Sequence, residues 1–377
     1  MRVLELLSSA WWTGPAEPMA SVARELAARG HAVELAVETL REGNLVARLR
    51  ADGFTVRDDL ALSTKSGPVR YLRDVRRLAA LARGGVDVLH ANFSHDHVLA
   101  LLALRDREGA RVVRTVHSAR ALARGGLQGA AFRRTDGLVA VCEAHARALV
   151  ERSGVPEARV LATRGAVDAA AFAPAGPDLR EELGIAPGVP VAGIVSRIKP
   201  GRRHEELVDA FRTVADRLPE ARLVIVGRGE GEEAIRVRVA HRGLQRNVGF
   251  AGYRTGDALA AAYRTFDVNV LLAEGNDGTC RALLEGMAAG RPGVAYRFGA
   301  PAEAIVDGAT GLLAPEGDVA ALADALVELL GAPARARALG RAARERMKTA
   351  FTEAARGEAV AAFLTRILSL PPAGRAA

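Results

Sequence analysis

A segment in the last third of the chain combines two carboxylates with glycines and helix-forming residues. It reads Glu274-Gly-Asn-Asp-Gly-Thr-Cys-Arg-Ala-Leu-Leu-Glu-Gly-Met-Ala-Ala-Gly-Arg-Pro-Gly293. Asp277-Gly278-Thr279 can begin a helix, whose unpaired N–H groups and positive dipole end suit an anionic phosphate. Asp277 and Glu285 lie eight residues apart, roughly two helical turns, so both carboxylates could face one ligand. The alternative is a solvated acidic helix start.

Three further residues that could bind or polarise a ligand directly follow apolar runs. They are Gly14, His117 and Arg197. Because the carboxyl ends of parallel strands meet at one edge of a sheet, where ligands bind, we expect these residues to line a binding cleft. A buried core histidine is the alternative for His117, and a merely exposed basic loop is the alternative for Arg197.

Apolar runs rich in Val, Leu and Ile alternate with helical patterns along the whole chain, which is typical of βαβ units. The predicted strands are 2–7, 32–37, 87–91, 111–116, 137–141 and 160–164 in the first half, and 189–195, 222–227, 248–252, 267–272, 293–297 and 311–314 in the second. The predicted fold class is α/β, with two Rossmann-like doubly wound parallel-sheet domains facing across a cleft.

The length of 377 residues also favours two domains. A stretch rich in turn-forming residues, 171–188, reads as the linker. We therefore predict an N-terminal domain over 1–175 and a C-terminal domain over 176–354. A final amphipathic helix ends at Pro371, and the segment from about 355 to 377 is expected to pack back on the first domain.

The amino-acid composition excludes several classes of protein. The chain is 49% hydrophobic and 25% charged, which supports a large core and argues against disorder. No run of ~18 uncharged apolar residues occurs, and Arg2 and Glu5 interrupt what would be the core of a signal peptide. Cys142 and Cys280 are too few for a disulfide framework. We expect a cytoplasmic protein with reduced thiols.

Over the whole chain, basic residues outnumber acidic ones by eight. Most of this excess lies in the first half, because residues 1–175 contain 25 basic and 19 acidic residues. The segment from Lys65 to Arg83 carries six basic residues and one acid in a helical pattern. A solvated helix and a helix docked on an anionic membrane surface remain equal alternatives. Nucleic acid is not expected as a partner, because stacking aromatics do not accompany the charge.

Two other clusters have weaker chemical interpretations. His90, Asn92, His95, Asp96 and His97 could suggest a metal site, but a helix cap at Ser94 or Asp96 explains the pattern better. The glycines of Gly227-Arg-Gly-Glu-Gly231 follow a strand but lack the spacing of a dinucleotide fingerprint.

These motifs together resemble a known family, the retaining nucleotide-sugar glycosyltransferases of group 1 (glycosyltransferase family 4), which have the two-Rossmann GT-B architecture. The family's pair of carboxylates is matched by Asp277 and Glu285 with the following Gly286-Met-Ala-Ala-Gly-Arg-Pro292. Further matches are Arg29-Gly-His-Ala-Val33, Thr115-Val-His117, Val139-Ala-Val-Cys-Glu143, Ser196-Arg-Ile198, Val224-Ile-Val-Gly-Arg-Gly229 and Asp307-Gly-Ala-Thr-Gly-Leu-Leu313.

The chain departs from the family pattern at four places. Asp277 stands where Glu is usual, unless Glu274 fills that position, and Arg202 replaces the usual Lys. Thr13-Gly14 replaces Gly-Gly in the first loop, and Arg164-Gly-Ala166 replaces Asn-Gly before Val167-Asp168. Because charge types are kept, we expect the activity to persist.

The resemblance assigns roles to the candidate residues. Arg197 and Arg202 would hold the diphosphate of the donor, since guanidinium groups bind phosphate oxygens in pairs, and would remove the need for a metal or other cofactor. Glu285 would bind the ribose. The sugar would contact Asp277, Gly278, Thr279 and His117, and Gly14 and Gly227 would line the substrate site.

The resemblance therefore implies a retaining, metal-independent transfer of sugar from a UDP-, GDP- or ADP-sugar to a hydroxyl acceptor. A glycan, a lipid-linked sugar and a small aglycone are the alternatives for this acceptor. A membrane-linked acceptor would place the protein at the inner face of the membrane. The alternatives are a nucleotide-sugar 2-epimerase of the same architecture and a non-catalytic protein that binds a nucleotide sugar.

Overall fold

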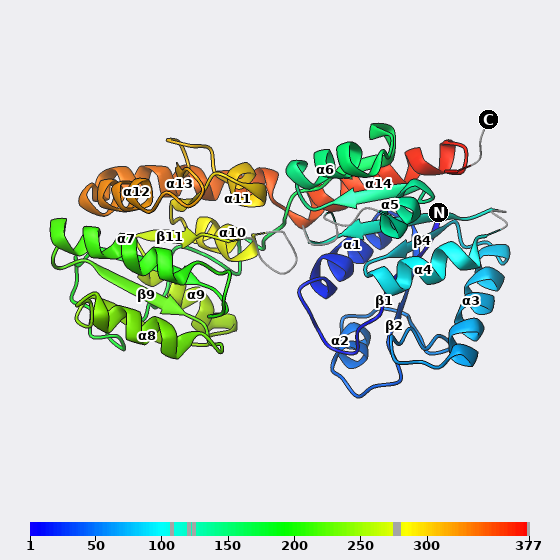
Figure 1. Cartoon of the computed structure of the whole chain (residues 1–377), viewed down its shortest axis with the longest axis horizontal. Coiled ribbons are helices and arrows are strands. Elements are labelled where there is room, and N and C mark those ends of the chain that lie inside the picture. The colour runs from blue at the N-terminus through cyan, green and yellow to red at the C-terminus, as the bar shows by residue number, and fades with distance from the viewer. Residues whose placement is uncertain (106–108, 119–121, 123–125, 274–279, 375–377) are drawn as a thin grey trace. The chain divides into compact units, whose positions relative to one another are not determined.

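The computed structural model describes residues 1–105, 109–118, 122, 126–273 and 280–374. The chain forms two compact units (Figure 1). Among the described residues, the first unit comprises those within 1–164 and 353–374, and the second comprises 165–273 and 280–352. The division falls at Arg164, ahead of the boundary that the sequence suggests at 175/176. Residues 165–175 are held within the second unit: Val167 N donates to Phe351 O at 2.9 Å, and Arg344 Nη1 donates to Ala169 O at 3.1 Å.

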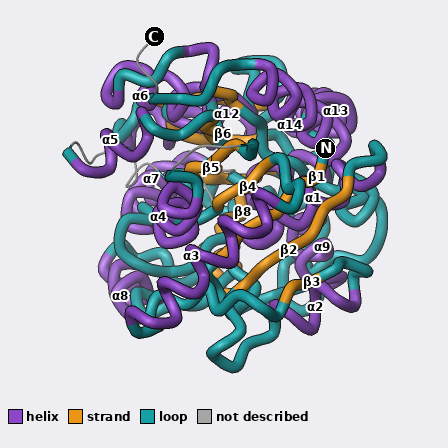
Figure 2. The backbone as a smooth tube through the Cα atoms, turned by 90° about the vertical axis from the view of Figure 1, so that its right-hand side faces the viewer, coloured by secondary structure: helices purple, strands orange, loops and turns teal. Residues whose placement is uncertain are grey.

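The first unit is built on a parallel sheet of seven strands in the order β3-β2-β1-β4-β5-β6-β7. Figure 2 shows β2, β1, β4 and β5 side by side. The strands are β1 (Arg2–Leu7), β2 (Ala32–Val37), β3 (Val56–Arg57), β4 (Val88–Ala91), β5 (Arg111–Val116), β6 (Gly137–Ala140) and β7 (Val160–Ala162). The order reverses between β1 and β4, so the loops after these two strands flank the switch point at which doubly wound folds bind ligands.

Helices cover both faces of this sheet. One face packs on α1 (Ala16–Ala28) and α14 (Glu353–Ser369), and the other packs on α3 (Pro68–Arg83) and α4 (Ser94–Ala103). The remaining described helices of the unit are α2 (Leu45–Ala51), α5 (Leu127–Arg133), α6 (Glu143–Ser153) and the short η2 (Glu157–Arg159).

The last helix, α14, belongs to the first unit because its apolar face completes that unit's core. Val360, Phe363, Leu364 and Ile367 are buried in one cluster with residues of β1, α1 and β4. Beyond the helix, Arg159 Nη2 donates to Pro371 O at 2.6 Å. The end of the chain is thus tied to the sheet formed by its beginning.

The second unit repeats the plan with a six-stranded parallel sheet in the order β10-β9-β8-β11-β12-β13. Its strands are β8 (Val191–Val195), β9 (Arg222–Val226), β10 (Val248–Gly252), β11 (Val268–Leu271), β12 (Gly293–Tyr296) and β13 (Gly311–Ala314). Its helices are α7 (His204–Arg217), α8 (Glu232–His241), α9 (Gly256–Thr265), α10 (Arg281–Ala288), α11 (Gly299–Ala304), α12 (Val319–Gly331) and α13 (Pro333–Ala350). The switch point lies between β8 and β11.

The predicted fold class is confirmed: both units are α/β, with Rossmann-like, doubly wound parallel sheets. All twelve predicted strands are present with ends shifted by two residues or fewer. The strand β3 was not predicted, because two residues at the sheet edge are too few to produce a pattern.

Candidate functional site

Basic side chains follow β8, beside the switch point of the second sheet. Arg197 is exposed, while Arg202 is half-buried in the turn before α7. Arg203 takes a left-handed conformation with φ of 61° at the start of that helix. Its guanidinium pairs with Glu316 and lies 5.3 Å from the ring centre of Tyr296. The guanidinium of Arg203 thus interacts with other residues of the protein. Arg197 instead faces solvent at the edge of the sheet where a ligand would bind.

The glycine loop after β9 packs against this basic loop. Gly227 has φ of 144°, and a Cβ there would lie 2.0 Å from the carbonyl oxygen of Ser196. Ile198 N donates to Arg228 O at 3.2 Å, and Gly231 N donates to Ile198 O at 3.0 Å. The glycines therefore allow the two loops to approach each other closely. Gly227 lies next to Arg197, as expected if both residues belong to one site.

Glu285 lies on α10, in the connection from β11 to β12, and is 9% exposed. The hydroxyl of Tyr263 donates to Glu285 Oε2 at 2.7 Å. Burial, with the charge of Glu285, raises the pKa of Tyr263 well above its usual value, which keeps the phenol a donor. Gly286 brings the helix onto β11, since a Cβ there would lie 2.1 Å from Asn269 Nδ2. The carboxylate is therefore held in one orientation.

The start of α10 differs from the sequence-based prediction. Asp277-Gly278-Thr279 was expected to begin the helix, but α10 begins at Arg281. Cys280 adopts a left-handed conformation with φ of 49°, which a continuous right-handed helix cannot contain. The candidate residues Glu274, Asp277, Gly278 and Thr279 lie outside the described residues.

In the first unit, Gly14 and His117 follow different strands of the sheet. Gly14 lies in the turn that Ala16 N closes on Thr13 O at 3.0 Å, immediately before α1. His117 follows β5 and is 6% exposed. Strand β4 separates β1 from β5 in the sheet. Both residues lie at the carboxyl edge of the sheet, as predicted for residues after strands.

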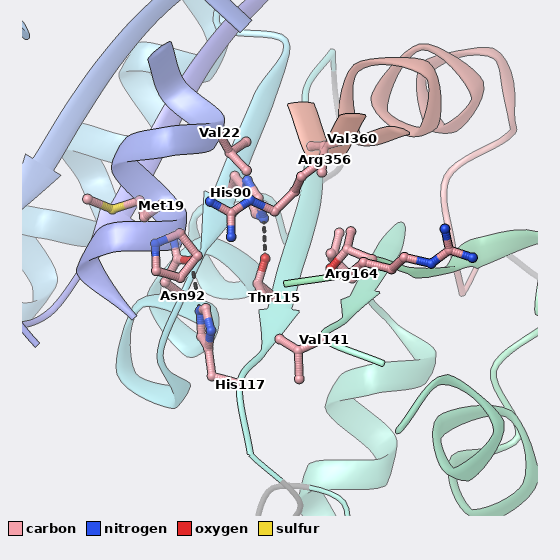
Figure 3. Close-up of a pocket in the computed structure, with 13 residues that line it drawn as sticks. Met19, Val22, His90, Asn92, Thr115, His117, Val141, Arg164, Arg356 and Val360 are labelled. Carbon is pink, nitrogen blue, oxygen red and sulfur yellow. Dashed lines mark hydrogen bonds between the residues drawn. The ribbon is translucent and has the colours of Figure 1, made fainter. Parts of the chain in front are cut away.

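A row of polar side chains leads across this sheet to His117. Glu5 of β1 is in register with His90 of β4, and Glu5 Oε1 lies 2.8 Å from His90 Nδ1. Thr115 Oγ1 is 2.8 Å from His90 Nε2. Alternate residues of a strand point to the same face, so Asn92 and His117 continue the row. The side chains of His117 and Asn92 meet at 3.1 Å (Figure 3).

His90, Asn92, Thr115 and His117 of this row line a small cavity, which is covered by side chains of α1 and α14 (Figure 3). The cavity has a volume of about 20 Å³, which is enough space for roughly one water molecule. Arg356 of α14 also lines it and lies 3.5 Å from Glu17 of α1. Burial first, and then the positive charge of Arg114, lowers the pKa of His117 to about 3. The imidazole is therefore neutral.

The histidine cluster near β4 has structural roles. His97 Nε2 lies 2.7 Å from Thr135 Oγ1, and Asp96 accepts the backbone N–H of Phe93 at 2.8 Å and of Asn92 at 3.1 Å. Asp96 is thus the helix cap that the sequence suggested. Within the described ranges, no three His, Cys, Asp or Glu side chains gather in a group that could hold a metal.

Sequence reasoning missed Glu5 and Tyr263 as supports of the site. Glu5 is fully buried within an apolar strand, and a lone acid in such a run is a signal that could have singled it out. Tyr263 gave no such signal, because its partner Glu285 is 22 residues away in sequence.

Two doubly wound sheets, each with polar side chains at its carboxyl edge, define a class of enzymes with two Rossmann-like units. Matches to models of known protein families identify the family of this chain. Residues 14–171 match "Glycosyltransferase Family 4", and residues 177–346 match "Glycosyl transferases group 1". The chain therefore belongs to the group-1 glycosyltransferases of the family 4 type, and it is a glycosyltransferase.

Relatives with assigned activities agree with this membership. A D-inositol 3-phosphate glycosyltransferase from Nocardia farcinica is 30% identical over 84% of this chain and 76% of its own length. A phosphatidyl-myo-inositol mannosyltransferase from Mycobacterium leprae is 33% identical over 66% of each chain. The comparisons do not favour the epimerase or the non-catalytic alternative.

Solved structures share the fold. A glycosyltransferase from Rickettsia africae superposes with a TM-score of 0.80 at 18% identity, over 98% of this chain and 99% of that one. The Anabaena protein HepE in complex with UDP gives the same TM-score and identity, over 97% of this chain and all of that one. In the described part of the chain, no helix has the length and apolar character needed to cross a membrane.

Proposed function

We propose that this glycosyltransferase uses a nucleoside-diphosphate sugar, retains the configuration of the transferred sugar, and needs no metal ion or other cofactor. The observation that carries the proposal is the exposed basic loop at the switch point of the second sheet, packed on the Gly227 loop. UDP bound to the structural neighbour HepE is consistent with a nucleotide donor.

The donor's diphosphate would bind Arg197 and Arg202. Guanidinium groups remain charged at any physiological pH and pair with phosphate oxygens. The same contacts would stabilise the charge that develops on the departing nucleoside diphosphate, which is the usual role of a divalent ion in such chemistry. Catalysis would then rest on orientation and electrostatics rather than on an enzyme nucleophile.

The ribose and the sugar would be held by residues with fixed orientation. Glu285, oriented by the Tyr263 hydroxyl, carries a carboxylate, which is the type of group that accepts hydrogen bonds from ribose hydroxyls. His117 would contact the sugar as a neutral side chain. Asp277, or Glu274 in its place, with Gly278 and Thr279, would complete the sugar site, and Gly14 would line the acceptor side.

A transfer assay with matched variants tests the donor assignment. We expect thermal stabilisation by one class among UDP-, GDP- and ADP-sugars, because a ligand that binds only the folded chain raises its Tm. Arg197→Ala should lower kcat/KM by about 100-fold or more, the scale of losing one charged contact to the transition state. Arg236→Ala is the control, because Arg236 is an exposed residue of α8 paired with Glu232. Equal activity of both variants would remove Arg197 from the site.

Product analysis tests retention and the absence of a metal. The NMR coupling of the anomeric proton should show the same configuration in product and donor. EDTA should leave the rate largely unchanged. An inverted product, or complete loss of activity restored only by Mg²⁺ or Mn²⁺, would refute the respective claim.

We further propose a hydroxyl acceptor carried by a lipid at the anionic inner face of the membrane, with α3 as the docking helix and the cytoplasm as the compartment. The relative from M. leprae carries phosphatidyl-myo-inositol in its name. On α3, Val69 is 76% exposed and Leu72 46% exposed, and the neighbouring Arg70, Arg73 and Arg76 are also exposed. Such a helix can insert apolar side chains while its arginines contact lipid phosphates.

Vesicle sedimentation tests this docking. The protein should bind vesicles containing anionic lipid and not purely zwitterionic ones, and added salt should weaken the binding. The double change Val69→Glu and Leu72→Glu should abolish it. Val237→Glu, at a valine of α8 that is 59% exposed, is the matched control. Undiminished binding of the double variant would refute a role for α3.

A further inference from the structure

The orientation of the Asn92 amide is determined by a backbone carbonyl. Asn92 Nδ2 lies 3.2 Å from the carbonyl oxygen of Leu6 and 3.2 Å from Glu5 Oε2. A carbonyl oxygen can only accept a hydrogen bond. The NH2 group of the Asn92 amide must therefore face β1, whatever the protonation of Glu5, and the amide oxygen must face the opposite way.

The amide oxygen of Asn92 faces His117. Asn92 Oδ1 lies 3.1 Å from His117 Nε2, and an amide oxygen has no hydrogen to give. His117 Nε2 must then carry the proton. In a neutral imidazole the other ring nitrogen has a lone pair. Nδ1 of His117 is thus a hydrogen-bond acceptor.

This acceptor has no partner within the described part of the protein. His117 Nδ1 is buried and makes no hydrogen bond there, and the ring is one wall of the small cavity. Its lone pair is left unmatched although the other ring nitrogen is firmly bound, which is an arrangement suited to a ligand that supplies the missing donor.

We infer that Asn92, anchored by the Leu6 carbonyl and Glu5, is a positioning residue that holds His117 in the Nε2–H tautomer, so that Nδ1 accepts a hydrogen bond from a hydroxyl group of the ligand. The identity of the ligand as a sugar rests on the proposed function, whereas the tautomer does not. In this role Asn92 acts through His117.

The geometry restricts the chemistry of the group that can bind there. A neutral acceptor favours a hydroxyl or N–H donor, and it offers nothing to a phosphate or carboxylate oxygen. The cavity has room for about one water molecule, so a single hydroxyl rather than a whole sugar ring would enter it. Glu5, which accepts from the Asn92 amide and is itself hydrogen-bonded to His90, opposes rotation of that amide.

The ligand-free protein provides the first test. In nitrogen-15 NMR spectra of histidine-labelled chain, the His117 signals are assigned by their absence in His117→Gln. We expect a protonated Nε2 and an unprotonated Nδ1 at neutral pH. A proton on Nδ1, or a doubly protonated ring, would overturn the inference without reference to any activity.

Two variants test the part played by Asn92. Asn92→Leu removes the oxygen that accepts from Nε2–H at similar volume, and we expect His117 to populate both tautomers. Thr115→Val is the matched control: it removes the neighbouring bond to His90 and should leave the His117 tautomer unchanged. A wild-type tautomer in Asn92→Leu would show that Asn92 does not position the ring. Melting curves establish that both variants are folded.

Donor analogues test the ligand contact. Fluorine in place of a hydroxyl cannot donate a hydrogen bond. For one position on the sugar, fluorine should lower kcat/KM by about tenfold in the wild type and by much less in Asn92→Leu. Equal losses in both proteins would refute the contact with Nδ1. Absence of transfer with every nucleotide sugar would instead refute the proposed function, while the NMR result would stand.

Discussion

At the scale of single residues, the site depends on buried polar groups with assigned partners. Glu5, Asn92 and His117 form one such chain in the first unit, and Tyr263 with Glu285 form another in the second. Each joins segments distant in sequence. A pattern along one chain reveals residue types and spacing, but the register between strands decides which side chains meet. His117 and Glu285 could therefore be singled out as candidates from the sequence, and their partners could not.

The buried imidazole predicts acid sensitivity of the first unit. An unfolded histidine takes up a proton below about pH 6.5, whereas His117 in the fold does so only near pH 3. The unfolded state therefore binds more protons between these values, and the free energy of unfolding falls as the pH falls. His117→Gln should reduce this slope by up to about 1.4 kcal/mol per pH unit.

Tryptophan fluorescence can follow that transition by urea titration between pH 5 and 7. Both tryptophans of the chain, Trp11 and Trp12, lie in the first unit. An unchanged slope in His117→Gln would show that this histidine titrates normally in the folded protein.

The hydroxyl of Tyr263 predicts a defined effect on donor binding. Tyr263→Phe removes the hydroxyl that donates to Glu285 Oε2, so the carboxylate is less firmly oriented. We expect a Kd for the nucleoside diphosphate about three- to tenfold higher, the range of one hydrogen bond, as measured by calorimetry. Phe266→Leu, a change at a buried ring 6.0 Å from Tyr263 without a hydroxyl, controls for packing. An unaltered Kd in Tyr263→Phe would contradict the role of Glu285.

At the scale of elements, α14 should govern the stability of the first unit although it is the last helix of the chain. Phe363 is 2% exposed and lies in the core cluster with β1 and α1. Phe363→Ala should lower the free energy of unfolding by about 3–5 kcal/mol, as measured by the tryptophan signal. Glu358→Ala, on the exposed side of the same helix, should have little effect. Similar curves for both would contradict the packing.

The elements also show where prediction from sequence succeeds. Strands such as β1 and β9 are buried along nearly all of their length and are mainly apolar in sequence, so their predicted bounds were accurate to within one residue. The predicted start of helix α10 was wrong. The sequence around Asp277 favours a helix N-terminus, but the backbone of Cys280 is left-handed, and the helix begins only after it. A single backbone reversal leaves no trace in hydrophobic periodicity.

At the scale of the whole molecule, the described residues proposed to bind the nucleoside diphosphate part of the donor all lie in the second unit. Arg197, Arg202, Gly227 and Glu285 fall between residues 165 and 352, and two apolar clusters of described residues there are internal to this unit. The fragment 165–352 should fold alone and bind the nucleoside diphosphate with a Kd within about tenfold of the full chain, without catalysing transfer. A folded fragment with no affinity would place essential donor contacts in the first unit.

The hydrogen bond between Val167 and Phe351 brings the entrance and exit of the second unit together. That unit is therefore an insert, joined to the rest of the chain at two neighbouring points. A cassette with this connection can be exchanged between relatives by recombination, since only one pair of junctions has to match. The sugar a relative delivers and the molecule it modifies can then change independently.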